Sequence, residues 1–185
     1  MSLRILAGSH RGRVLTTPER RDALRPTSAR RREAVFDILT AQLGDLTDVS
    51  LADLFAGTGA VGLEALSRGA ARVVFVENDP AATRLIRRNL DTLGLGGRAR
   101  VLQNDASRLG VTAEPVDAVF LDPPYGRGLA ERALTKLRDG GWLAPDAVVL
   151  VELGRDDALT PPAGYTLARD HPHGAGRLLR LEAAG

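Results

Sequence analysis

From residue 50 onward, short apolar runs alternate along the chain with segments of helical spacing. The apolar runs are Leu51–Phe55, Arg72–Glu77, Ala99–Gln103, Val116–Leu121 and Ala147–Glu152. The helical segments between them are Val61–Arg68, Ala81–Leu93 and Leu129–Arg138. Near-continuous apolar strands separated by helices predict an α/β fold, in which a mostly parallel sheet is covered by helices on both faces.

Both ends of the chain depart from this alternation. Near the N-terminus, Arg4–Thr17 alternates loosely around two glycines and predicts a short hairpin. A helix is expected next over Ala29–Leu43, capped by Thr27 or Ser28. Near the C-terminus, the flanks of Gly174 and Gly176, at Tyr165–Arg169 and Arg177–Leu181, predict an antiparallel hairpin that closes one edge of the sheet.

Length and composition fit one cytoplasmic domain. The 185 residues suffice for a single core, and no apolar run approaches the roughly 20 residues of a membrane span. The start of the chain lacks the apolar stretch of a signal peptide. The absence of cysteine excludes disulfides, thiolate zinc sites and cysteine nucleophiles.

Positive charge is concentrated at the N-terminus. Residues 1–32 carry nine arginines against two acidic residues, so this segment has a charge of +7 and the remainder −5. Arg30, Arg31 and Arg32 fall in the first turn of the expected helix, where the helix dipole disfavours cations. A bound phosphate would relieve that conflict, so the basic segment favours contact with a nucleic acid over a merely solvated basic face.

A glycine-rich loop after the first strand indicates a nucleotide-like cofactor. Gly57, Gly59 and Gly62 form G-x-G-x-x-G between a strand and a helix, where the backbone can approach a ligand closely. Both NAD and S-adenosylmethionine fit this pattern. Asp53 favours S-adenosylmethionine, because a carboxylate attracts the methionine ammonium and repels a pyrophosphate.

Further polar side chains follow the next two strands. Glu77 is expected to accept hydrogen bonds from the ribose hydroxyls, and Asp105 to accept one from the adenine amino group. The structural alternatives are a helix-capping carboxylate for Asp53 and an N-cap for Asp105. The predicted cofactor-binding set is Asp53, Ala56, Gly57, Thr58, Gly59, Glu77, Asn78, Asn104, Asp105 and Ala106.

The segment Asp122-Pro123-Pro124-Tyr125 predicts the catalytic centre. Two prolines cannot continue a strand ladder, so they fix a turn at the edge of the sheet where α/β folds bind ligands. Asp122 and the Pro123 carbonyl can accept both N–H groups of an exocyclic amine on a base, which frees the nitrogen lone pair for attack on a methyl group. Tyr125 offers a face on which an extruded base can stack. No metal is required.

Taken together, these segments resemble the RsmD-type bacterial 16S rRNA (guanine-N2)-methyltransferases, within the class I Rossmann-like methyltransferases. The resemblance extends over essentially the whole chain. It is carried by Arg4–Gly8, Arg11–Arg13, Leu24–Thr27, Arg30–Glu33, Asp53–Gly59, Gly62–Gly69 and Asp122–Tyr125. Several amino-methylating families share the last motif, and the basic N-terminal segments narrow the choice.

The resemblance implies a seven-stranded sheet with an antiparallel last strand, and S-adenosylmethionine as cofactor. It implies a monomer, with no membrane partner, that methylates a guanine in 16S rRNA of the assembling 30S subunit. Residues 1–45 would be the RNA-contacting extension and residues 46–185 the catalytic core of one domain. The implied RNA-binding residues are Arg11, Arg13, Arg25, Thr27, Arg30 and Arg32.

Three alternatives remain open. A DNA adenine-N6 or protein glutamine methyltransferase would use the same turn, but such enzymes usually favour Asn at its first position and carry an additional recognition segment. An NAD-dependent oxidoreductase would need a proton-relay pair such as Tyr-x-x-x-Lys, and Lys136, the single lysine, lacks that tyrosine. A non-catalytic RNA-binding module would be expected to have lost Asp122 or the glycine loop.

Overall fold

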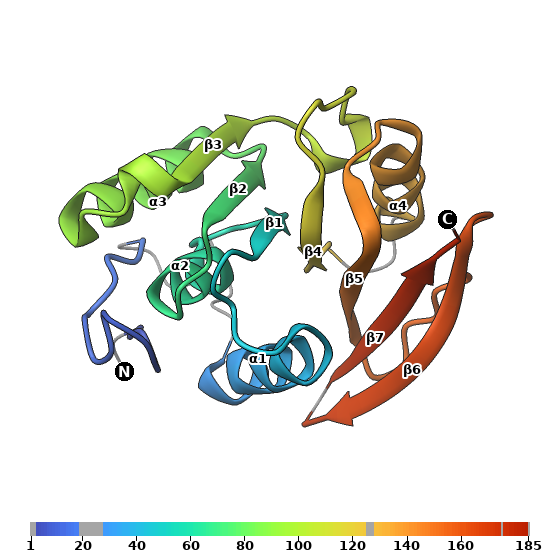
Figure 1. Cartoon of the computed structure of the whole chain (residues 1–185), viewed down its shortest axis with the longest axis horizontal. Helices are drawn as coiled ribbons and strands as arrows, with labels where there is room; N and C mark the ends of the chain where they lie inside the picture. Colours follow the sequence, from blue (N-terminus) through green and yellow to red (C-terminus); the bar gives the residue numbers. More distant parts are fainter. Residues whose placement is uncertain (1–2, 19–27, 125–127, 175, 185) are drawn as a thin grey trace.

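The computed structural model describes residues 3–18, 28–124, 128–174 and 176–184. In these residues one seven-stranded sheet has the order β3-β2-β1-β4-β5-β7-β6 (Figure 1). The strands are β1 (Ser50–Leu54), β2 (Arg72–Glu77), β3 (Ala99–Gln103), β4 (Val116–Leu121), β5 (Leu143–Gly154), β6 (Tyr165–His173) and β7 (Gly176–Ala183). The helices are α1 (Ala29–Leu43), α2 (Ala60–Ser67), α3 (Pro80–Leu93) and α4 (Leu129–Asp139), with short 3-10 turns η1 (Gly96–Arg98) and η2 (Ala106–Arg108).

The predicted strand directions are confirmed. Strands β1 to β5 pair in parallel, whereas β7 pairs antiparallel with both β5 and β6. The last strand in sequence therefore lies inside the sheet, and β6 forms the edge. Strands β5 and β6 are longer than the apolar pattern predicted: β5 begins at Leu143, which pairs with Val116 of β4, and pairing with β7 extends β5 to Gly154 and β6 to His173.

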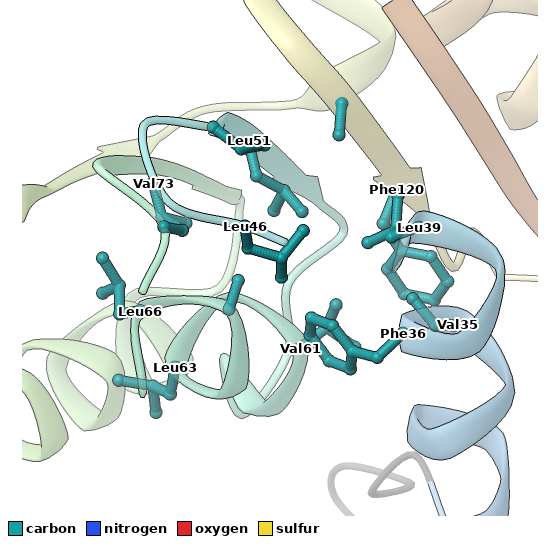
Figure 2. Close-up of a cluster of buried hydrophobic side chains, with 14 of the residues drawn as sticks. Val35, Phe36, Leu39, Leu46, Leu51, Val61, Leu63, Leu66, Val73 and Phe120 are labelled. Carbon is teal, nitrogen blue, oxygen red and sulfur yellow. The ribbon is translucent and has the colours of Figure 1, made fainter. Parts of the chain in front are cut away.

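Each face of the sheet has its own hydrophobic core. Helices α1, α2 and α3 cover one face over Leu51, Phe75 and Phe120, and Figure 2 shows α1 and α2 side chains meeting the sheet there. Helix α4 covers the other face over Leu54 and Val119. The burial of strands on both faces matches the prediction from their continuous apolar sequences. None of the helices in the described part of the chain has the length and apolarity needed to cross a membrane.

The N-terminal hairpin is fastened to α2. A bridge between Arg4 and Val14 confirms the hairpin. Both oxygens of the buried Glu64 carboxylate accept backbone N–H groups, from Leu6 at 2.8 Å and Ala7 at 2.9 Å. Gly8 has φ +81°, and a Cβ there would lie 1.9 Å from a backbone oxygen of α2. The hairpin is thus held at a fixed position against α2.

Candidate active site at the carboxyl ends of the strands

The glycine-rich loop links β1 to α2 as predicted. Gly59 ends the loop in the left-handed region, with φ +73°, and α2 begins at the next residue. Gly62 sits where α2 crosses β2, because a Cβ there would lie 2.2 Å from the Phe75 ring. Thr58 in the loop is buried, whereas Ala56 and Gly57 are half-buried. Glycine therefore serves both the turn of the loop and the close packing of the helix on the sheet.

Asp53 is buried beneath this loop, at the end of β1. Its Oδ2 atom accepts the backbone N–H of Gly62 at 2.9 Å and so caps α2, whose own N-cap Gly59 has no side chain to do so. Burial, helped by the negative charges of Asp122 and Glu77, raises the pKa of Asp53 to about 8, against the lowering effect of the hydrogen bond from Gly62. The structure thus shows the helix-capping role weighed from sequence; contact with a methionine ammonium stays a prediction.

Glu77 ends β2 and holds the glycine loop from the other side. Its Oε2 atom accepts the N–H of Gly57 at 2.8 Å, and its Oε1 atom accepts that of Asp79 at 2.8 Å. Each carboxylate oxygen can accept a second hydrogen bond. Glu77 therefore lies next to the loop, with Asn78 as an exposed neighbour, and its contact with a ribose stays a prediction.

The residues after β3 form a turn beside Glu77. The backbone N–H of Asn104 donates to the Glu77 carbonyl at 3.0 Å. Asp105 caps η2, since its Oδ1 atom accepts the N–H of Ser107 at 2.8 Å and its hydroxyl at 2.7 Å. These bonds lower the pKa of Asp105. The N-cap alternative is the role that the structure shows. Contact with adenine by this residue or by the buried Ala106 stays a prediction.

Asp122 follows β4 between the ends of β1 and β5. Its backbone N–H donates to the Leu54 carbonyl at 3.4 Å, so the residue is fixed directly beside the strand that carries Asp53. Strand β4 ends at Leu121, and the prolines form the expected stop, with Pro123 buried and Pro124 exposed. The predicted stacking residue Tyr125 lies outside the described residues.

A fifth carboxylate, Glu152 on β5, belongs to this edge and was missed from sequence. It ends an apolar run, so the pattern gave no reason to separate it from the core. Its side chain is fully buried; its Oε2 atom lies 3.1 Å from His173 Nε2, and its Oε1 atom 3.4 Å from Arg31 Nε. Burial and the charge of Asp122 raise the pKa of Glu152 to about 7, against the opposing effect of Arg31.

The predicted RNA-binding residues differ in their exposure to solvent. Arg11 and Arg13 on the hairpin and Arg30 on α1 are exposed. Arg25 and Thr27 lie outside the described residues. The prediction for Arg32 is wrong: it is 2% exposed, and its guanidinium donates to the Arg4 carbonyl at 2.7 Å. Helical periodicity turns this position inward, where the arginine joins the hairpin to α1.

A hollow of about 240 Å³ adjoins the Pro-Pro turn. Its walls include the apolar side chains of Leu129, Leu153 and Leu159, and the carboxylates of Glu131 and Asp156 stand among them. Apolar walls with hydrogen-bond acceptors suit a planar group that carries N–H donors, and the carboxylates would repel a phosphate.

Comparison with known proteins gives consistent matches over the whole chain. The family model described as Conserved hypothetical protein 95 matches residues 3–181. "Ribosomal RNA small subunit methyltransferase D" of Escherichia coli K12 is 41% identical over 186 residues, which cover 99% of this chain and 92% of the relative. The protein of the same name from Haemophilus influenzae is 36% identical, covering 93% and 89%. The solved structure of Escherichia coli yhhF has a TM-score of 0.85 and 37% identity, covering 100% and 99%.

Proposed function

Because this chain belongs to the family described as Conserved hypothetical protein 95, and its similar relatives are named as small-subunit rRNA methyltransferases, we propose that it transfers a methyl group from S-adenosylmethionine to 16S rRNA. The acceptor is the exocyclic N2 amine of a guanine. The observation that carries this proposal is the position of Asp122 and the following Pro-Pro turn beside the glycine loop, at the carboxyl ends of β1 and β4.

The acceptor amine is prepared by two oxygen atoms of the chain. The lone pair of an exocyclic amine is delocalised into the ring, which makes the nitrogen a poor nucleophile. Hydrogen bonds from its two N–H groups to the Asp122 carboxylate and the Pro123 carbonyl favour a pyramidal nitrogen, with its lone pair outside the ring. S-adenosylmethionine supplies a methyl group on a positively charged sulfur. The fixed turn and loop then contribute by holding the reactants in line.

The charges at this edge fit a cationic cofactor. Asp53, Glu77 and Asp122 lie close enough for their charges to act on one another, since the last two raise the pKa of the first. An ammonium and a sulfonium are attracted by this environment, whereas the pyrophosphate of NAD would be repelled. Asp53 holds the methionine ammonium, Glu77 the ribose hydroxyls and Asp105 the adenine amine.

The N-terminal residues supply the RNA contacts. Residues 1–45 form the RNA-contacting extension of a single domain whose residues 46–185 bind the cofactor, and the protein acts as a monomer on the assembling 30S subunit. Arg11, Arg13 and Arg30 offer exposed guanidinium groups for RNA phosphates. The anchoring of the hairpin by Glu64 fixes two of these arginines relative to Asp122.

The proposal is tested by transfer of tritiated methyl from S-adenosylmethionine to 30S subunits that lack the modification, with nucleoside analysis of the product. N2-methylguanosine is expected. Asp122→Ala should reduce transfer at least about 100-fold, because it removes the oxygen that accepts one of the two amine N–H groups, while cofactor affinity measured by calorimetry stays within about threefold. Methylation of DNA adenine or protein glutamine in place of rRNA would overturn the substrate assignment.

A further inference from the structure

Glu152 is a buried carboxylate that the proposed chemistry leaves unused. The side chain has no exposed surface, and Oε1 has no hydrogen-bond partner among the described residues. A buried charged oxygen without a hydrogen bond is costly unless a ligand or a nearby charge compensates it. The room around Oε1 is kept by Gly176 on β7, where a Cβ would lie 3.0 Å from this atom.

Strand register places Glu152 beside Asp122. Strands β4 and β5 pair in parallel with Leu121 opposite Val151, so one further step brings Asp122 next to Glu152. Adjacent positions at one register point to the same face of a sheet, and neighbouring strands are about 4.8 Å apart. The two carboxylates also interact electrostatically, since the charge of Asp122 raises the pKa of Glu152. Two acceptor groups thus stand side by side at the end of β4, where the proposed function places the amine.

We propose that Glu152 reads the ring N1–H of the target guanine while Asp122 holds the neighbouring N2 amine. This inference rests on the proposed function and deepens it. The edge of guanine presents N1–H and N2–H₂ as adjacent donors, which match two adjacent carboxylates. Adenine presents an acceptor at N1 beside its N6 amine, so an ionised Glu152 would repel it. The pair therefore selects guanine over adenine, whereas an Asp-Pro-Pro turn alone serves either amine.

Arg31 covers Oε1 in the free protein. Its Nε atom lies 3.4 Å from Oε1, beyond a good hydrogen bond, and its side chain is 19% exposed. The guanine edge takes the place of Arg31 and gives Oε1 a direct hydrogen bond. His173 stays on Oε2 at 3.1 Å and fixes the orientation of the carboxylate. The freed guanidinium, in the first turn of α1, is then available to an RNA phosphate.

The inference is tested with 30S subunits whose target guanosine is replaced by 2-aminopurine or 2,6-diaminopurine. Both analogues keep the N2 amine and carry an acceptor at N1, but both also lack the O6 carbonyl of guanine, so a loss common to both is assigned to N1 only where Glu152→Gln reduces it. The wild-type protein should methylate each at least about tenfold less efficiently than guanine, measured as kcat/KM, because a site built to bind a donor rejects an analogue that lacks it.

Glu152→Gln should lower kcat/KM for guanine and reduce the preference over the analogues at least about threefold, since its amide can donate to N1. Glu182→Gln, an exposed carboxylate on β7, is the matched control and should keep the wild-type preference. Equal rates on guanine and both analogues with the wild-type protein would overturn the inference, even if the Gln variant does not fold. An equal loss on all three substrates would also overturn it and assign Glu152 a structural role. Failure to methylate guanine at all would instead refute the proposed function.

Discussion

Replacing Asp53 by asparagine should stabilise the free protein at alkaline pH and weaken its binding of S-adenosylmethionine. The carboxylate is buried under the glycine loop and accepts one hydrogen bond, from the Gly62 N–H. Asparagine keeps the shape and the acceptor oxygen of this cap but carries no charge. The substitution therefore separates the capping role from the electrostatic role of the same side chain.

The size of the effect follows from the raised pKa of Asp53. The folded-state pKa is about 8, against 3.8 for an aspartate in water, so the folded protein holds a proton that the unfolded chain releases. The resulting stability is complete below about pH 4 and is lost as the pH rises toward 8. A pKa difference of about four units corresponds to about 5 kcal/mol of stability that the wild type loses as the pH rises. The asparagine variant has no proton to release and does not undergo this loss. Its buried amide N–H group adds an unfavourable contribution of about 1–3 kcal/mol, but this is the same at every pH.

The measurement is urea unfolding at pH 5, 7 and 9, with and without S-adenosylmethionine. Relative to the wild type, the free energy of unfolding of Asp53→Asn should rise with pH by several kcal/mol in the absence of cofactor. Saturating cofactor should stabilise the wild type at high pH and so remove much of this difference, because an ammonium favours the ionised carboxylate. Asp37→Asn, at an exposed position on α1, is the control and should track the wild type. A difference between Asp53→Asn and the wild type that does not change with pH would refute the reasoning.

Three further predictions concern the basic segment and the glycine motif. Removing Arg11 and Arg13 should weaken rRNA binding and lower the slope of log K against log salt by up to about two, as followed by filter binding; an unchanged slope would exclude phosphate contacts by these residues. Arg32→Ala should instead lower the melting temperature with little change in that slope, because this guanidinium is buried against Arg4. Gly62→Ala should cost at least about 1–3 kcal/mol by overpacking against β2, seen as a lower melting temperature; an unchanged value would contradict the close approach there.

Most of the fold was predictable because its signals are local. Continuous apolar strands, such as Val116–Leu121, require cover on both faces, and the helices between them supply it. The predicted helix Ala29–Leu43 has the observed bounds and is capped by Ser28, one of the two expected residues. The lengths of β5 and β6 were less predictable, because backbone hydrogen bonds to a neighbouring strand continue beyond the last apolar residue of each strand.

The sequence by itself determined the parallel sheet, the glycine loop after β1 and the Pro-Pro stop after β4, because glycine, proline and apolar periodicity act on the backbone close to where they occur. Tertiary structure alone decided that Arg32 is buried and that Glu152 stands beside Asp122 under Arg31. These relations join residues far apart in the chain. They depend on strand register and on how α1 packs against the sheet, which composition and spacing do not encode.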